Sequence, residues 1–334
     1  MFESTVLTFT DLDAYHASIR GVQVDGVVTS RGDFRVKWTG IQLERLSMQR
    51  SEETLPRVAN NAVDPKIYGI VFATNPNQPS AYLKGLELSP ADMIIFSVGS
   101  EGHNRTEAAF QWGSIALAHE DLAAAGEVLI GRELTAPSVT QRIRPPLPLL
   151  LRLSNLHKAA GLLAETSPDI LANPQVARAM EQALMEAMIA CAASGDAADA
   201  RSANCHHGAV VRRLEEFLEA NFYDTIYVHE LCKATGVSYP TLRGCCQEQL
   251  GMSPKRYLWL RRMNLAHRAL RVADPVTATV TEIATKHGFW ELGRFSVAYH
   301  GLFGEPPSVS LRRPPAIDDL AKFTGRPSRL VKSA

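Results

Sequence analysis

The pattern of apolar residues is typical of strands in the first part of the chain and of helices in the rest. This change divides the chain into a β region and a helical region. Residues 1 to about 145 contain short β-branched or aromatic runs, separated at fairly regular intervals by Gly, Asn, Pro and Asp. Such runs predict strands, and a small antiparallel barrel or sandwich is the economical arrangement for them. The clearest runs are 34–38, 67–72, 93–98 and 114–117, and a short helix is expected at 120–126.

The pattern becomes helical after the Pro-Pro-Leu-Pro segment at 145–148. Helices are expected near 152–165 and 174–193, the second with Asn173 as N-cap and Pro174 at its first position. Apolar residues of the second helix fall on one stripe at helical spacing: Val176, Met180, Ala183, Leu184, Ala187, Met188 and Cys191. This stripe suits packing onto the β region and pairing with a partner helix equally well.

Small and polar residues from Ser194 onward indicate a linker between two domains. We therefore divide the chain into an N-terminal domain (1–193), a linker (194–209), a C-terminal helical domain (210–313) and a tail (314–334). The linker and the tail carry no motif that assigns them a function.

The C-terminal domain contains the same outline twice, a short helix, a tight turn and a second helix. In the later copy (280–303), Thr279 and Glu282 form a capping box, Gly288 follows the first helix, and the second helix, near 291–302, ends before Gly304. The earlier copy (229–250) has Gly236 at the turn and Ser238 as the N-cap of its second helix. This outline is that of a helix-turn-helix reader of the DNA major groove.

One long helix is expected between the two copies, from Pro254 to Val272 with Ser253 as its cap. It would be about 28 Å long. That length can hold two recognition helices roughly one duplex turn apart, which is about 34 Å.

Charge is unevenly distributed although the formal net charge is zero. Residues 1–207 contain 17 basic and 23 acidic side chains, whereas residues 208–334 contain 18 and 12. The basic excess of the C-terminal half favours a polyanionic partner for that half alone.

Few residues point to catalysis or to a metal. His16, His103 and His119 are too scattered for the clustered ligands of a metal-binding cupin, and Cys205-His206-His207 has no fourth ligand nearby. The sequence has neither a Gly-rich phosphate loop nor a nucleophile elbow. We therefore expect no enzymatic activity, no cofactor and no metal, although the β region could hold a small ligand in its interior.

Cysteine usage and hydropathy bear on the compartment. The five cysteines are odd in number and lack the spacing of a disulfide framework, which fits a reducing cytoplasm. A basic segment leading into an apolar stretch is missing at the start, and no run of 18 apolar residues occurs. We expect neither a signal peptide nor a membrane span.

The C-terminal domain resembles the AraC/XylS family of transcriptional regulators, with the XylS-type branch as the nearer match. In the first copy and the long helix the matching residues are Leu231, Ala234, Gly236-Val237-Ser238, Leu242, Leu250-Gly251-Met252-Ser253-Pro254, Tyr257-Leu258, Arg261, Leu265-Ala266 and Ala269-Leu270. In the second copy they are Glu282-Ile283-Ala284, Gly288-Phe289, Gly293-Arg294-Phe295-Ser296, Tyr299, Phe303-Gly304 and Pro307-Ser308. The resemblance covers 211–313. It implies an α+β protein with an N-terminal cupin-like antiparallel β-barrel bearing two helices and a C-terminal all-α double helix-turn-helix domain.

Two positions depart from the family pattern. Cys246 stands where the family usually has a core Phe, and Tyr227 stands where Ser or Thr usually precedes the first short helix. The smaller cysteine leaves less apolar volume, so we expect local repacking around it.

The resemblance places base-reading residues near the start and middle of the second helix of each copy. They are Tyr239, Pro240, Thr241, Arg243, Gly244 and Gln247 in the first copy, and Trp290, Glu291, Leu292, Gly293, Arg294 and Val297 in the second. Arg243 is the best candidate for a direct base contact, because arginine pairs bidentately with guanine. Leu292 and Gly293 cannot read base edges by side-chain hydrogen bonds, so the second copy would rely on phosphates, thymine methyl groups and duplex shape. A core position is an equal alternative for Trp290.

The resemblance also implies the partners. They are double-stranded promoter DNA, RNA polymerase, a small-molecule effector of unknown identity and a second copy of the chain in a homodimer. An effector-responsive activator is the commoner family outcome, and the alternative is a constitutive regulator or repressor whose barrel only dimerises. Two enzymatic alternatives lack their residues: a cupin metalloenzyme needs a His/Glu cluster, and a DNA-repair methyltransferase with a similar domain needs four N-terminal cysteines, whereas no Cys occurs before Cys191.

Overall fold

The computed structural model describes residues 3–198, 203–221 and 226–313. The chain forms two compact units. Unit 1 comprises 1–222 and 226–257, and unit 2 comprises 223–225 and 258–334. Unit 1 therefore holds the β region and the first helix-turn-helix copy, and the second copy lies in unit 2. The boundary falls inside the long helix rather than in the polar segment 194–209.

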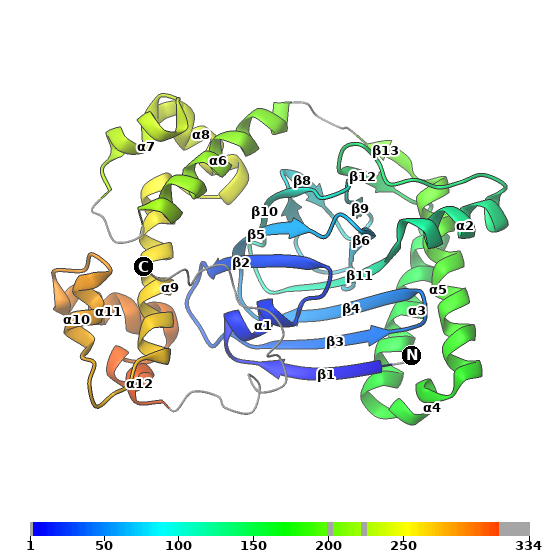
Figure 1. The fold of residues 1–334 in the computed structure, drawn as a ribbon, viewed down its shortest axis with the longest axis horizontal. Coiled ribbons are helices and arrows are strands. Elements are labelled where there is room, and N and C mark those ends of the chain that lie inside the picture. The colour runs from blue at the N-terminus through cyan, green and yellow to red at the C-terminus, as the bar shows by residue number, and fades with distance from the viewer. Residues whose placement is uncertain (1–2, 199–202, 222–225, 314–334) are drawn as a thin grey trace. The chain divides into compact units, whose positions relative to one another are not determined.

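Two antiparallel sheets build the β region of unit 1 (Figure 1). Sheet A has the strand order β1-β3-β4-β11-β6-β9-β12-β13, and sheet B has the order β2-β5-β10-β7-β8. The strands are β1 (Glu3–Phe9), β2 (Val22–Val28), β3 (Val36–Gln42), β4 (Leu46–Glu53), β5 (Arg57–Val63), β6 (Ile67–Ala73), β7 (Ala81–Leu83), β8 (Leu86–Leu88), β9 (Met93–Ile95), β10 (Glu101–Arg105), β11 (Phe110–Ala118), β12 (Gln141–Arg144) and β13 (Asp196–Ala198). The antiparallel β architecture expected from the sequence is confirmed.

Within the described residues, five helices accompany these sheets. The family resemblance led us to expect two, and the sequence pattern predicted three. The five are α1 (Leu12–Ser18), α2 (His119–Ile130), α3 (Leu147–Thr166), α4 (Pro168–Ala172) and α5 (Pro174–Ser194). The two that the sequence pattern missed, α1 and α4, are too short to show periodicity. Local capping starts α1, because the Ala14 amide donates to Asp11 Oδ1 over 2.9 Å.

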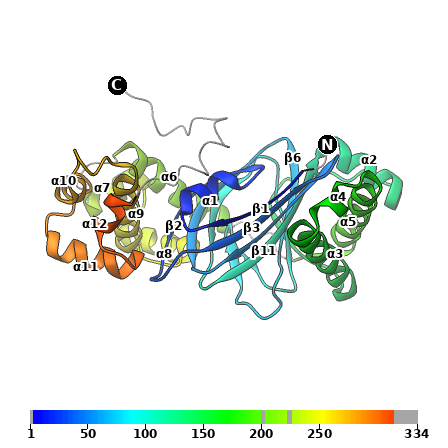
Figure 2. The same cartoon turned by 90° about the horizontal axis from the view of Figure 1, so that it is seen from below.

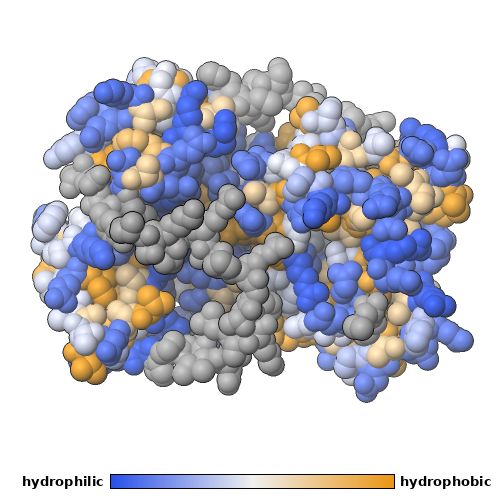
Figure 3. Space-filling model, in the orientation of Figure 1, coloured by the Kyte–Doolittle hydropathy of each residue, from blue (hydrophilic) through white to orange (hydrophobic). Residues whose placement is uncertain are grey.

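Sheet A is apolar on both faces because each of its faces is covered. On β11, Trp112 points toward sheet B and joins Phe9, Trp38 and Phe96 in one core cluster. Ile115 points the opposite way and packs with helix residues in a second cluster. The layers are therefore helices, sheet A and sheet B, as the side view shows (Figure 2). On the surface drawn in Figure 3, apolar side chains form small areas among hydrophilic ones.

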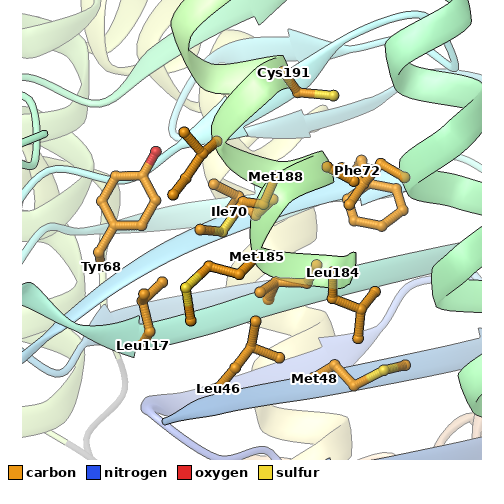
Figure 4. Close-up of a cluster of buried hydrophobic side chains, with 14 of the residues drawn as sticks. Leu46, Met48, Tyr68, Ile70, Phe72, Leu117, Leu184, Met185, Met188 and Cys191 are labelled. Atoms are coloured by element: carbon orange, nitrogen blue, oxygen red, sulfur yellow. The ribbon is translucent and has the colours of Figure 1, made fainter. Parts of the chain in front are cut away.

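The apolar stripe of α5 belongs to the core of unit 1. Leu184, Met188 and Cys191 are buried and point toward strand residues such as Ile70 and Phe72 (Figure 4). Val176 and Met180 pack against the same cluster. This stripe is thus occupied within the chain, and the interpretation of it as a self-association seam is wrong. Periodicity cannot distinguish a stripe that faces its own sheet from one that faces a second copy.

Part of the range assigned to a linker has regular structure. β13 pairs with β12, Asp196 opposite Arg144, and α6 begins at Ala203. Residues 199–202 and the tail from 314 lie outside the described residues.

The C-terminal part is helical throughout, as expected. Its helices are α6 (Ala203–Ala220), α7 (Val228–Thr235), α8 (Tyr239–Leu250), α9 (Pro254–Val272), α10 (Val280–Lys286), α11 (Leu292–Phe303) and α12 (Pro307–Arg312). The protein is therefore of the α+β class, with antiparallel sheets followed by a helical region that contains two helix-turn-helix motifs. Within the described ranges, every helix is too short or too polar to cross a membrane.

Candidate DNA-binding surface and ligand cavity

The first helix-turn-helix motif, α7 and α8 of unit 1, is fixed by local hydrogen bonds at its turns. The Tyr227 amide donates to Glu230 Oε2 over 2.7 Å, so the carboxylate holds the start of α7 although Tyr replaces the usual Ser or Thr. Gly236, at φ +70°, ends α7 in the left-handed conformation that favours glycine. The hydroxyl groups of Ser238 and Thr241 then join over 2.9 Å at the start of α8.

One face of α8 is buried, and the opposite face carries the predicted base-reading residues. The buried side consists of Leu242, Cys245, Cys246, Gln249 and Leu250. The exposed side consists of Pro240, Thr241, Arg243, Gly244 and Gln247, with Tyr239 half-exposed. Arg243 and Gln247 are four residues apart in the sequence, so they lie on the same side of the helix. Among the described residues, Arg243 has no hydrogen-bond or ion-pair partner that would hold its guanidinium group away from DNA.

Cys246 is fully buried in the position where the family usually has Phe. Burial raises the pKa of its thiol to about 12, and burial also raises the pKa of the Cys245 thiol. Both side chains therefore remain neutral thiols near neutral pH, which disfavours nucleophilic or redox chemistry.

The second helix-turn-helix motif, α10 and α11 of unit 2, begins with the predicted capping box. The Thr279 amide donates to Glu282 Oε2 over 3.0 Å, and the Glu282 amide donates to Thr279 Oγ1 over 3.2 Å. Gly288, at φ +78°, turns the chain after α10. The turn ends in an aromatic core, where the ring centroids of Phe289 and Phe295 lie 4.9 Å apart.

A hydrogen-bonded chain fixes the other end of α11. The Tyr299 hydroxyl donates to Ser310 Oγ over 2.7 Å, and Ser310 donates to Glu305 Oε1 over 2.6 Å. Because the Tyr299 proton goes to Ser310, His267 Nδ1 is the donor in its 2.6 Å contact with the Tyr299 oxygen. These bonds set the orientation of α11 within unit 2.

All six positions predicted for base reading in the second motif are exposed. Trp290 is 72% exposed and Val297 75% exposed, so the alternative that Trp290 is a core residue is wrong. Arg294 pairs with Glu291, Nε to Oε2 at 3.0 Å, and both side chains are largely exposed. This pair offsets the only positive charge among the six positions, so their surface is less cationic than that of α8.

A cavity of about 720 Å³, its open mouth included, lies between the two sheets of unit 1. Its walls are mainly apolar and come from both sheets: Val22, Val24, Val63, Val71, Leu83, Phe96, Phe110 and Trp112. Polar lining residues include Gln49, Arg57, Asn61, Asn104 and Ser114. The sequence did not reveal this site, because its residues are scattered from Ile19 to Ser114 and share no motif.

A buried ion pair lies at one side of the cavity. Arg57 binds both carboxylate oxygens of Glu53, Nε to Oε2 at 2.6 Å and Nη2 to Oε1 at 3.0 Å. Glu53 also accepts from the Tyr15 hydroxyl at 2.7 Å and from Trp112 Nε1 at 2.6 Å. Burial raises the pKa of Tyr15 well above its usual value, with Glu53 adding to the effect, so Tyr15 acts as a neutral donor.

Strand β10 connects the cavity wall with helix α6 inside unit 1. Asn104 lines the cavity, whereas the neighbouring His103 points to the other side of sheet B. His103 Nε2 lies 3.4 Å from Oε1 of the buried Glu215 on α6. The Tyr257 hydroxyl, at the start of α9, donates to the same oxygen.

The scattered histidines of the N-terminal region have separate surroundings. His16 and His103 are buried, and His119 contacts the Pro65 carbonyl oxygen. Across the described residues, no group of three or more His, Cys, Asp or Glu side chains could hold a metal ion.

Comparisons with known proteins agree with this geometry. Residues 231–313 match the family model described as a helix-turn-helix domain. The chain is 35% identical over 150 residues to the "Probable thc operon regulatory protein" of Rhodococcus erythropolis, a match that spans 45% of each chain. It is 30% identical over 108 residues to the "XylDLEGF operon transcriptional activator 2" of Pseudomonas putida. This match covers 32% of this chain and 69% of that protein.

Among solved structures, the AraC-like transcriptional activator CuxR matches 79% of this chain and 96% of its own, with 15% identity and a TM-score of 0.39. Of the two sequence relatives, the second is matched over more than two thirds of its own length. The two helix-turn-helix motifs and these relatives together show that the chain belongs to the AraC/XylS family of transcriptional regulators.

Proposed function

We propose that the protein is a sequence-specific activator that reads the major groove of promoter DNA with α8 and α11. One observation carries this proposal: each of these helices buries one face, and the positions predicted for base reading, on the helix or just before it, are exposed, with Tyr239 half-exposed. A recognition helix requires this division, since its inner face must fix the helix while its outer side chains reach base edges.

The two helices contribute unequally in this proposal. Arg243 and Gln247 on α8 are hydrogen-bonding side chains that suit guanine and adenine edges, respectively. Trp290, just before α11, and Leu292 and Val297 on α11 offer apolar surface for thymine methyl groups, and Arg294 is already paired with Glu291. We therefore assign most direct base discrimination to α8, and assign phosphate, methyl and shape contacts to α11.

We further propose that a small effector binds the cavity between the sheets and changes DNA binding. Strand β10 supports this proposal, because Asn104 lines the cavity and the preceding residue, His103, contacts Glu215 on α6. A ligand that alters the position of β10 would thereby alter the support of the first helix-turn-helix motif.

The active form is proposed to be a homodimer that engages RNA polymerase, as the family resemblance implies. With the α5 stripe occupied, the leucines on the outer side of α3 are the better candidates for the dimer contact. Leu151 and Leu162 lie about three turns apart, so they share one side of the helix. They are 51% and 55% exposed. If the full chain with Leu151→Asp and Leu162→Asp sediments as the same dimer as the parent, this assignment of the contact is wrong.

The central experiment selects genomic DNA fragments bound by the purified chain and then measures transcription from them with RNA polymerase. We expect one recurring sequence element and increased transcription when the protein is present. Retention of all fragments alike would contradict sequence-specific binding, and reduced transcription would favour a repressor. Equal transcription with and without every small molecule tested would favour the constitutive alternative.

A further inference from the structure

The chemical character of the cavity between the sheets indicates what kind of molecule it takes. Two features decide this: how the charges around the cavity are compensated, and which polar atoms inside it lack partners. The argument rests on the proposed function, in which a small molecule binds at this site.

Charge in the cavity is compensated by the protein itself. Both oxygens of Glu53 bind Arg57, and the same carboxylate accepts from Tyr15 and Trp112. At the edge of the cavity, the Arg105 guanidinium group lies 3.7 Å from the ring centroid of Tyr82 and also pairs with Glu107. In the described part of the chain, Nε of Arg105 is buried without a hydrogen-bond partner, but Glu107 already balances the charge of this guanidinium group. An anionic ligand would therefore compete with Glu53 or Glu107 for an arginine, and a cationic ligand would meet two arginines. Both charged classes are therefore disfavoured.

Two asparagines supply neutral polar groups inside the apolar walls. Asn61 on β5 and Asn104 on β10 line the cavity from adjacent strands, where Asn104 is opposite Ala59 and Asn61 is opposite Gly102. Asn61 is only 6% exposed. Within the described residues, Oδ1 of Asn61 and Oδ1 of Asn104 are buried and have no hydrogen-bond partner. Buried polar atoms normally have partners, so these two amides are suited to meet a ligand.

We infer that the cavity binds an uncharged, largely apolar molecule that carries a hydroxyl group, and that Asn61 and Asn104 recognise this hydroxyl. A hydroxyl both donates and accepts, so it matches either end of an amide. The apolar walls from Val24, Val63, Phe96 and Phe110 bind the rest of the molecule.

Three shape-matched probes test the inference on the full chain: 2-naphthol, naphthalene and 2-naphthoate, measured by equilibrium dialysis at neutral pH. We expect 2-naphthol to bind about tenfold more tightly than naphthalene, the effect of one or two hydrogen bonds to a buried polar group. We expect 2-naphthoate to bind more weakly than 2-naphthol. Tighter binding of the carboxylate, equal binding of naphthol and naphthalene, or binding of none of the three would overturn the inference.

Variants locate the recognition. Asn61→Leu and, separately, Asn104→Leu should lower 2-naphthol affinity toward that of naphthalene while naphthalene affinity stays unchanged. Asn60→Leu is the matched control, since Asn60 lies next to Asn61 on the same strand and points to the other face of sheet B. Loss of affinity for both probes in the Asn61 and Asn104 variants, or an equal loss in Asn60→Leu, would contradict recognition by these amides.

The same samples separate this inference from the proposed function. Binding of the chain to a fragment selected from genomic DNA is measured with and without 2-naphthol. If 2-naphthol binds through Asn61 and Asn104 but DNA binding never changes, effector control fails and the ligand class stands. If DNA binding responds to 2-naphthoate alone, effector control stands and the ligand class fails.

Discussion

Arg57 and Glu53 form a two-bond ion pair inside unit 1, and both side chains are buried. Such a pair is sensitive to the loss of one partner, because the remaining charge stays buried without compensation. The pair also links the core between the sheets to the cavity wall. Arg57 lines the cavity, and Glu53 accepts hydrogen bonds from the core residues Tyr15 and Trp112.

Glu53→Gln should therefore lower the free energy of unfolding by about 3–5 kcal/mol, the usual effect of breaking a buried ion pair. Chemical denaturation of the full chain, monitored by circular dichroism, measures this change. Glu44→Gln is the control, because Glu44 is exposed and should change stability by less than about 0.5 kcal/mol. Similar values for the two variants would show that the ion pair contributes little.

His157 predicts a loss of stability in acid. It is buried on α3 and donates from Nε2 to the Gln49 carbonyl oxygen over 3.1 Å. Burial, with the nearby Arg50 charge, lowers its pKa from 6.5 to about 4. The folded state thus binds fewer protons than the unfolded state between these pH values. The contribution is fully present above pH 6.5 and is lost as the pH falls toward 4, by roughly 3 kcal/mol in total.

Unfolding measured from pH 7 to pH 4 on the parent and on His157→Gln tests this. The variant should show a flatter dependence over that window, whereas His229→Gln, at an exposed position, should follow the parent. Nuclear magnetic resonance titration of the His157 ring provides a second measurement on the parent protein. A ring that titrates near its ordinary pKa would refute the prediction.

Arg243→Ala should weaken binding to the selected operator by about 1–3 kcal/mol and relax the preference at one base pair. The reason is that an arginine on the exposed side of α8 can pair with both acceptors of guanine. Fluorescence anisotropy against operators mutated at each position measures the effect. Arg294→Ala on α11 is the comparison, and we expect it to weaken binding without shifting base preference. A uniform loss across all sequences for Arg243→Ala would reassign that residue to a phosphate contact.

Thr279→Ala should destabilise the start of α10 by ~1 kcal/mol, because it removes the side chain that accepts from the Glu282 amide. Hydrogen exchange of the α10 amides, compared with those of α8, measures this local effect. Thr281→Ala serves as the control, since Thr281 accepts the hydrogen bond from the Thr285 hydroxyl with its backbone carbonyl oxygen. Equal exchange in both variants would mean that the capping box does not set the stability of α10.

Features encoded by neighbouring residues were predictable from the sequence. The capping box at Thr279 and Glu282, the cap of α5 at Asn173 and the glycine turn at Gly236 all form as expected. Each involves contacts between residues at most a few positions apart, so local geometry alone determines it. The positions predicted for base reading on α8 came from the family resemblance, and the structure shows five of the six exposed and Tyr239 half-exposed.

Features that depend on distant parts of the chain were not predictable in this way. The stripe on α5 has the spacing of a dimer seam, yet Leu184 and Met188 meet sheet A of the same chain. Trp290 was as compatible with a core position as with the surface until the turn between α10 and α11 placed it outside. Asn61 and Asn104 gave no signal in the sequence, because their common position in the cavity arises only when β5 and β10 pair.

The sequence by itself determined the family and the order of the C-terminal helices, because motif residues, caps and turns are local properties, and the family resemblance supplied the positions expected to face DNA. The tertiary structure decided what the apolar stripes pack against, that a cavity lies between the sheets, and that the charges beside it are paired. These properties depend on side chains brought together from distant strands, and the register of the sheets, rather than spacing along the chain, determines which of them meet.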